Sequence, residues 1–339
     1  MMSIVYVDEQ GAALHRHGET ILVEKDSRII AKIPLAQLDE LVIVGNISIT
    51  TPVMAFLLDQ AIPTAFITSH GRYRGRLSLA DGKNAGLRIA QFERYQDADY
   101  CLRFSKMVVV AKIANLVDFL RHHARNHPDS EVGHQADRIG KYLRSVRHAE
   151  SRESLRGVEG AAAAQYFAAF GKLVRMEFRF TKRSRRPPRD PINALLSLGY
   201  TLLARELVAA VSAVGLDPAI GFYHEIDYGR PSLAIDLLEE FRFLADSLAI
   251  ALVNKGMLNR HDFENADGGG IYLSEKGREI FFREYEAMMR RTIRAGAKGE
   301  CASYRRMLFN QTQRLASAIK TQIAYRPFHR SCRVYCSSL

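Results

Sequence analysis

The first 85 residues contain short apolar runs that are separated by turn residues. Glycines and the pair Asp26-Ser27 divide these runs, as is typical between neighbouring strands. A helix is predicted after Thr51, which can cap it, because Pro52 fits the first helical position. We therefore expect a small β-rich domain over residues 1–85 with a sandwich-like sheet. Its predicted strands are Ile4–Val7, Thr20–Glu24, Arg28–Ile33, Leu41–Val44, Ile62–Thr68 and Gly71–Leu79.

After a predicted connection at Asp81–Asn84, the apolar residues recur with a helical period almost to the end. A hairpin or tight turn is expected around Asp267–Gly270, and Ser274 can cap a further helix. The fold class is thus α+β: a β-rich domain (1–85), a larger all-helical domain (86–328) and a tail (329–339). The predicted long helices are Tyr100–Arg125, Ser154–Phe170, Asp190–Gly215, Ser232–Gly256 and Cys301–Ala324.

The composition is that of a globular protein with an excess of positive charge. Hydrophobic residues make up 47% and charged residues 25% of the 339 positions, which excludes disordered and collagen-like classes. Lysine and arginine number 48 against 37 acids, a net charge of +11. This excess indicates an anionic partner, first of all nucleic acid, although it is also compatible with simple solubility. No signal peptide or uncharged apolar span is evident, so we expect a cytoplasmic protein without membrane contact.

The positive charge gathers in one segment, where eight basic residues lie between Lys172 and Arg189 against a single acid, Glu177. The segment ends in Pro187-Pro188, which predicts an ordered loop. Arginine predominates, and its planar guanidinium suits phosphate oxygens. Binding of a polyanion through its phosphates is favoured; a solvated basic loop without a partner is the alternative. A second basic set comprises Arg290, Arg291, Arg294, Lys298, Arg305 and Arg306.

Glu159 lies on the apolar stripe of its predicted helix, which a carboxylate tolerates only if a cation or hydrogen-bond donors meet it. Gly157 and Gly160 flank it and leave room for a close approach. Alternatively, Glu159 merely benefits from the helix N-terminus, one turn after Ser154.

Asp236, Glu239 and Glu240 project along one flank of the next apolar helix. Like charges packed together favour a cation between them, either a metal ion or the ordinary ion-pair partners Arg242 or Arg230. Carboxylates together with the imidazole of a histidine, here His224 in the loop before this helix, suit Mg²⁺ or Mn²⁺. Such an ion beside a phosphate-binding surface is typical of phosphodiester chemistry. Zinc is not favoured at Cys332 and Cys336, because no second ligand pair follows at zinc-site spacing.

Five motifs in order give the chain a family resemblance. They are LRGVEG (155–160), PRDPINALLS (188–197), GFYH (221–224), GRPSLAIDLLEEFR (229–242) and YRPF (325–328). Together they resemble the universal CRISPR-associated spacer integrase, a metal-dependent DNA endonuclease and integrase of CRISPR adaptation.

The resemblance implies that the N-terminal domain builds a homodimer and that the helical domain is catalytic. It implies one divalent ion, Mg²⁺ or Mn²⁺, held by Glu159, His224 and Glu239 as catalytic ligands, with Asp236 as an accessory carboxylate; whether Glu239 or Asp236 is the direct ligand stays open. The 3′-hydroxyl of a captured DNA would attack a phosphodiester at the edge of a CRISPR repeat. A small second adaptation protein is the implied protein partner. The residues expected to hold the DNA backbone are Lys182, Arg183, Arg185, Arg186, Arg189 and Arg230.

Two rival hypotheses remain at this stage. One is a metal-dependent repair nuclease that cuts branched DNA, and the other is a nucleic-acid-binding scaffold without catalysis.

Overall fold

A computed structural model describes residues 4–60, 62–69, 73–77, 84–126, 130–266, 268–295 and 300–330. The chain divides into two compact units, Met1–Gly82 and Lys83–Leu339, where the sequence predicts a boundary at residue 85. The predicted tail cysteines Cys332 and Cys336, and Lys298 of the second basic set, lie outside the described residues.

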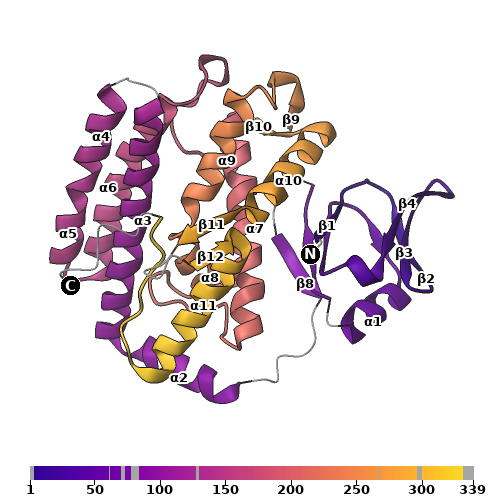
Figure 1. The fold of residues 1–339 in the computed structure, drawn as a ribbon, viewed down its shortest axis with the longest axis horizontal. Helices are drawn as coiled ribbons and strands as arrows, with labels where there is room; N and C mark the ends of the chain where they lie inside the picture. Colours follow the sequence, from indigo (N-terminus) through magenta and orange to yellow (C-terminus); the bar gives the residue numbers. More distant parts are fainter. Residues whose placement is uncertain are drawn as a thin grey trace. The chain divides into compact units, whose positions relative to one another are not determined.

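In its described residues the first unit contains two four-stranded sheets and one α-helix, α1 (Thr51–Asp59) (Figure 1). One sheet has the order β1-β5-β7-β8, in which β1, β5 and β7 are parallel and β8 is antiparallel. The other has the order β4-β3-β2-β6, with antiparallel pairs except for the parallel pair β2-β6. The strands are β1 (Ile4–Val7), β2 (Ala13–His17), β3 (Thr20–Lys25), β4 (Arg28–Pro34), β5 (Glu40–Val44), β6 (Ser48–Ile49), β7 (Thr64–Ile67) and β8 (Tyr73–Leu77).

One apolar core joins both sheets and α1. Leu14 and Val23 from one sheet, Leu41 from the other and Leu57 from α1 belong to a single buried cluster. This is the sandwich-like arrangement that the sequence predicts. Two strands were missed, since β2 carries polar residues at its end and β6 has only two residues.

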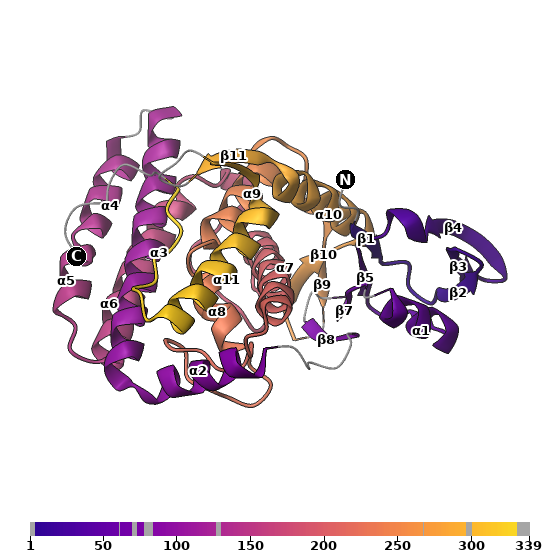
Figure 2. The same ribbon diagram turned by 60° about the horizontal axis from the view of Figure 1, so that its bottom comes forward.

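The second unit is mostly helical (Figures 1 and 2). The helices α3 to α6 pack on one another; α7 contacts α8, α9 and α11; and the two groups meet where α3 packs on α9. The prediction of a helical domain is confirmed, and the hairpin expected around Asp267–Gly270 is the pair β9-β10. A second hairpin, β11-β12, was not predicted. The elements are α2 (Ala85–Gln96), α3 (Ala98–Asn126), α4 (Ser130–Gly140), α5 (Tyr142–His148), α6 (Arg152–Gly171), α7 (Pro191–Val214), α8 (Ser232–Leu238), α9 (Arg242–Asn254), β9 (Phe263–Ala266), β10 (Gly270–Leu273), α10 (Glu275–Arg290), β11 (Thr292–Ala295), β12 (Glu300–Ser303) and α11 (Tyr304–Thr321).

The central helix α7 begins and ends where its sequence predicts. The side chain of Asp190 accepts from the backbone of Asn193, Pro191 takes the first position, and Gly215 ends the helix in the left-handed region. By length and composition α7 could cross a membrane, but 78% of its most apolar window is buried inside the unit, as in the core helix of a soluble protein. The helix α6 starts earlier than predicted, because Ser151 caps it and Ser154 completes a capping box.

The helix predicted from Ser232 to Gly256 is in fact two helices. The chain leaves α8 after Leu238 and enters α9 at Arg242, with Phe241 at φ −117° and ψ 4°. The interruption separates Glu239 from Glu240, which a continuous helix would keep on one flank. Glu239 therefore contacts the candidate site, whereas Glu240 contacts a different part of the unit.

Candidate active site

A buried lysine joins two of the predicted acidic residues. Lys112 of α3 pairs with Glu159 of α6, and its Nζ lies 2.6 Å from Oε2 of Glu239 at the end of α8. The side chain of Glu159 is 21% exposed, whereas that of Glu239 is 2% exposed. Glu159 and Glu239 therefore face each other across one cation, where the two helix groups of the unit meet.

Asp236 organises the loop that carries the predicted histidine. Its Oδ2 accepts from the backbone amides of Phe222 (2.7 Å) and Tyr223 (3.0 Å). Its Oδ1 accepts from the backbone amide of His224 (2.9 Å) and lies 2.8 Å from His224 Nδ1. Gly221 permits this contact, since a Cβ there would lie 2.8 Å from Oδ2. The carboxylate, fully buried, is thus surrounded by four N–H groups.

The orientation of His224 follows from this contact. A carboxylate only accepts hydrogen bonds, so Nδ1 carries the proton and donates it to Asp236. In the neutral form of the imidazole the lone pair is then on Nε2, which lies 3.9 Å from Oε1 of Glu239. The ring of Tyr223 packs edge-on against the imidazole, with 4.8 Å between ring centroids. Burial, with the charges of Glu159 and Glu239, raises the pKa of Tyr223, so its hydroxyl stays protonated.

Glu239 is held ionised inside the protein. Burial alone would raise its pKa, but the charges of Arg242 and Lys112 outweigh burial and hold the pKa well below its usual range. Arg242 contacts both carboxylate oxygens, through Nε at 2.6 Å and a terminal nitrogen at 2.7 Å. This two-bond geometry fixes the carboxylate plane.

Glu240 does not belong to this group, although the sequence places it beside Glu239. Its carboxylate accepts from the hydroxyl of Tyr325 and from the backbone amide of Phe328, each at 2.6 Å. Asn115 adds hydrogen bonds to the carbonyls of Glu240 (2.8 Å) and Phe328 (3.0 Å). Burial raises the pKa of Glu240 to about 8. Glu240 therefore anchors the C-terminal YRPF segment (325–328) to the core.

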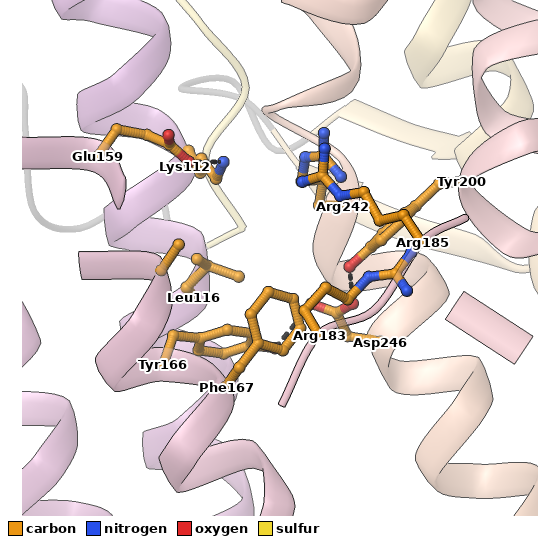
Figure 3. Close-up of a pocket in the computed structure, with 11 residues that line it drawn as sticks. Lys112, Leu116, Glu159, Tyr166, Phe167, Arg183, Arg185, Tyr200, Arg242 and Asp246 are labelled. Carbon is orange, nitrogen blue, oxygen red and sulfur yellow. Dashed lines mark hydrogen bonds and ion pairs between the residues drawn. The ribbon is translucent and has the colours of Figure 1, made fainter. Parts of the chain in front are cut away.

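A pocket adjoins Glu159 (Figure 3), with about 350 Å³ of empty space that opens to solvent. Leu116, Tyr166 and Phe167 from α3 and α6 form one side, and Arg183 and Arg185 lie across from them. Deeper in, Asp246 accepts from the hydroxyls of Tyr166 (2.7 Å) and Tyr200 (2.5 Å). The pocket thus offers guanidinium groups and aromatic faces next to the acidic cluster, a combination that suits a nucleic-acid strand.

The basic loop before α7 contains both anchoring and exposed residues. Arg183 is largely buried: it donates to Asn193 (2.6 Å) and to Ser197 (3.1 Å), and burial lowers its pKa to about 10. Arg189 donates to the backbone of Gly268 at 3.0 Å. Three other residues of the loop are exposed, and their side chains make no hydrogen bond or ion pair within the described chain. These are Lys182, Arg185 and Arg186.

Residues 5–287 match the family model described as CRISPR associated protein Cas1. The chain belongs to the Cas1 family. The CRISPR-associated endonuclease Cas1 3 of Thermus thermophilus is 37% identical over 331 residues, which cover 96% of this Cas1 chain and 97% of that protein. A CAS1 protein from Thermotoga maritima has a similar structure, with a TM-score of 0.82 and 27% identity over 97% of this chain and 100% of that one. A Cas6-RT-Cas1–Cas2 complex matches with a TM-score of 0.83 and 26% identity; this chain covers 98% of its own length but 36% of that chain.

These comparisons confirm the predicted family and fold class. They also confirm, at the level of the family, that this Cas1 chain is a CRISPR-associated endonuclease. The roles of individual residues rest on geometry alone. The structure brings Glu159, His224, Asp236 and Glu239 together, yet no group of three or more His, Cys, Asp or Glu in the described part of the chain is already arranged around a metal position. The ammonium of Lys112 lies between two of these residues, Glu159 and Glu239.

Some predicted contacts have other roles in this Cas1 chain. Arg183 and Arg189 also bind the protein itself, as described above, and their assignment to DNA stays a prediction. Arg305 of the second basic set forms a buried ion pair with Glu206 at 2.8 Å, and so does not present its charge to a polyanion. Arg230 is partly exposed.

The glycines beside Glu159 do not mark a close contact within the chain. Gly157 and Gly160 lie on the exposed face of α6, and a Cβ at either would meet nothing within 4 Å. The expected close approach is therefore absent from the described residues.

Sequence reasoning missed Lys112, although a signal for it exists. The residue interrupts a run of α3 in which Val109, Ala111 and Ile113 are at most 1% exposed. A lysine in such a run requires a buried acidic partner.

Proposed function

We propose that this Cas1 chain inserts short captured DNA into a CRISPR array by phosphodiester transfer at a metal centre formed by Glu159, His224 and Glu239. The observation that carries the proposal is the buried cation between Glu159 and Glu239, with an imidazole nitrogen 3.9 Å from Glu239. Two carboxylates that already bind one cation and lie beside an imidazole have the chemistry of a divalent-ion site.

The donor set fits Mg²⁺ or Mn²⁺. Carboxylate oxygens suit both ions, and the imidazole favours Mn²⁺. Glu239 is supported as the direct ligand in preference to Asp236, because the oxygens of Asp236 are engaged by four N–H groups. Asp236 would hold the imidazole of His224 with Nε2 unprotonated, which is how buried carboxylates commonly orient a metal-binding histidine.

In the proposed reaction the 3′-hydroxyl oxygen of the captured DNA forms a new bond to a target phosphorus. The bond from that phosphorus to the target's own 3′-oxygen breaks, so one phosphodiester replaces another and no energy source is needed. A bound divalent ion would polarise the phosphate and stabilise the charge on the departing oxygen. The exposed guanidinium groups of Arg185 and Arg186 would hold the strand by its phosphates. Water in place of the hydroxyl gives hydrolysis.

Partners follow from the same reasoning. The Cas6-RT-Cas1–Cas2 complex contains a region similar to this chain, which supports a Cas2-type small adaptation protein as a partner. A homodimer through the first unit is supported by β4, which pairs only with β3 among the described strands and exposes Ile29 (52%) and Ile30 (49%). We place the protein and its DNA substrates in the cytoplasm.

The test is a strand-transfer assay with purified protein, its small partner, Mn²⁺, a labelled blunt duplex and a repeat-bearing plasmid. Glu159→Gln, His224→Ala and Glu239→Gln should each abolish transfer while DNA affinity stays within about tenfold, because phosphate contacts carry most of the affinity. Glu153→Gln, an exposed position on the same helix, is the matched control and should retain activity.

Each rival hypothesis predicts a different result in this assay. Plasmid cleavage without joined product would favour a repair nuclease. Unchanged activity of Glu159→Gln would favour a non-catalytic scaffold. Transfer by His224→Ala at saturating Mn²⁺ would remove His224 from the site.

A further inference from the structure

Lys112 is buried where lysine is uncommon. It is 7% exposed on α3, between apolar neighbours that are almost fully buried. Its ammonium contacts oxygens of two different glutamates, Glu159 Oε1 and Glu239 Oε2. The arrangement is that of a counter-ion placed between two acids.

The two glutamates depend on Lys112 to different degrees. Glu239 is also held by Arg242 through two hydrogen bonds. For Glu159, Lys112 is the one cationic partner among the described residues. Lys112 therefore draws Glu159 of α6 toward the end of α8, although the two carboxylates would otherwise repel each other.

We infer that Lys112 occupies the cation position of the metal-free site and that a divalent ion must displace its ammonium to bind Glu159 and Glu239. This inference rests on the proposed metal centre. The oxygens that Lys112 contacts are those a divalent ion would use, and an ion within coordination distance of both glutamates would stand where the ammonium now lies. The lysine stem is flexible, and the solvent-open pocket that Lys112 lines gives the ammonium a place to move.

Competition of this kind weakens metal binding by a predictable factor. If the ammonium occupies the site in nine molecules of ten, the apparent dissociation constant is about tenfold above that of the vacated site. Removing the ammonium should therefore tighten metal binding and at the same time destabilise the metal-free protein, because two buried carboxylates lose their shared cation.

The test is Mn²⁺ titration by calorimetry of the full chain, with thermal melting in EDTA as the second measurement. Lys112→Met is expected to bind Mn²⁺ about tenfold more tightly, to melt lower in EDTA and to gain more from Mn²⁺ than the parent protein. Lys112→Arg keeps the charge and is expected to bind Mn²⁺ no more tightly than the parent. Lys112→Arg is the variant to be measured if Lys112→Met does not fold.

Two matched controls separate occupancy from general charge. Lys106→Met changes a partly exposed lysine of the same helix that donates to the carbonyl of Arg147 at 3.0 Å. Arg185→Met removes a charge that lines the same pocket without contacting either glutamate. Both should leave Mn²⁺ affinity within about twofold of the parent, since neither occupies the site.

Unchanged or weaker Mn²⁺ binding by folded Lys112→Met overturns the inference, as does equal tightening by Arg185→Met or tighter binding by Lys112→Arg. Glu159→Gln distinguishes this failure from that of the proposed function. If Mn²⁺ binding survives in Glu159→Gln unchanged, the ion binds elsewhere and the metal centre itself is wrong, whatever Lys112 does.

Discussion

Replacement of Asp236 by asparagine should destabilise the protein severely, although the two side chains have the same shape. The carboxylate of Asp236 accepts hydrogen bonds from four N–H groups, two on each oxygen, at 2.7 to 3.0 Å. Asparagine has one oxygen, so in either orientation its amide nitrogen must face two donors. Two hydrogen bonds to a charged acceptor are lost, each contributing about 1.5–3 kcal/mol, so the free energy of unfolding should fall by about 3–6 kcal/mol.

The measurement is equilibrium urea denaturation followed by circular dichroism at 222 nm, since the chain has no tryptophan. Asp227→Asn is the matched control, because Asp227 is exposed in the same loop and, among the described residues, its carboxylate accepts only from the neighbouring amide of Tyr228. Its effect should stay within about 0.5 kcal/mol. Asp236→Asn should also weaken Mn²⁺ binding about 10- to 100-fold through His224. A loss of less than about 1 kcal/mol in Asp236→Asn would refute the role assigned to its four contacts.

Three further changes test other parts of the site. Gly221→Ala should lower the melting temperature and abolish transfer, because the new Cβ would lie 2.7 Å from the backbone of Ser232; a normal melting curve would contradict this. Burial raises the pKa of Asp246 to about 6 from 3.8, so the folded state holds its proton longer. The stability that the protonated carboxyl group contributes is fully present below pH 3.8 and is lost as the pH rises through 6. Relative to Asp246→Asn, the parent should lose about 2 kcal/mol between pH 4 and 7 in urea titrations, and a pH-independent difference would count against it. Arg185→Ala with Arg186→Ala should weaken DNA binding and lower its salt slope by about 2 in binding titrations without changing stability, whereas Arg183→Ala should mainly destabilise; the reverse pattern would exchange their roles.

Local signals in the sequence were sufficient for some elements and not for others. The bounds of α7 follow from Asp190-Pro191 and Gly215, which act within one turn of the chain. The interruption after Leu238 has no such signal, because neither glycine nor proline is present and the apolar pattern continues through Phe241. The cause is tertiary: Glu240 binds a segment that lies 85 to 88 residues further along the chain.

Four residues of the candidate site could be proposed from the sequence, but the contacts that each of them makes could not. Motif order identified Glu159, His224, Asp236 and Glu239, and the structure brings them together. Helical projection could not show that Asp236 faces a backbone loop while Glu239 faces Lys112, because spacing along a helix does not reveal what lies opposite. Burial also distinguishes Arg183 from Arg185, and composition alone gives both the same charge.

The junction between α8 and α9 cannot gain or lose a residue without disturbing the site. Within five residues, 236–240, Asp236 must face one loop, Glu239 the neighbouring helices and Glu240 the C-terminal segment at 325–328. An inserted or deleted residue would rotate whatever follows by about 100°. Length variation should therefore be excluded here, while the exposed bend at 225–229 on the other side of His224 can absorb it.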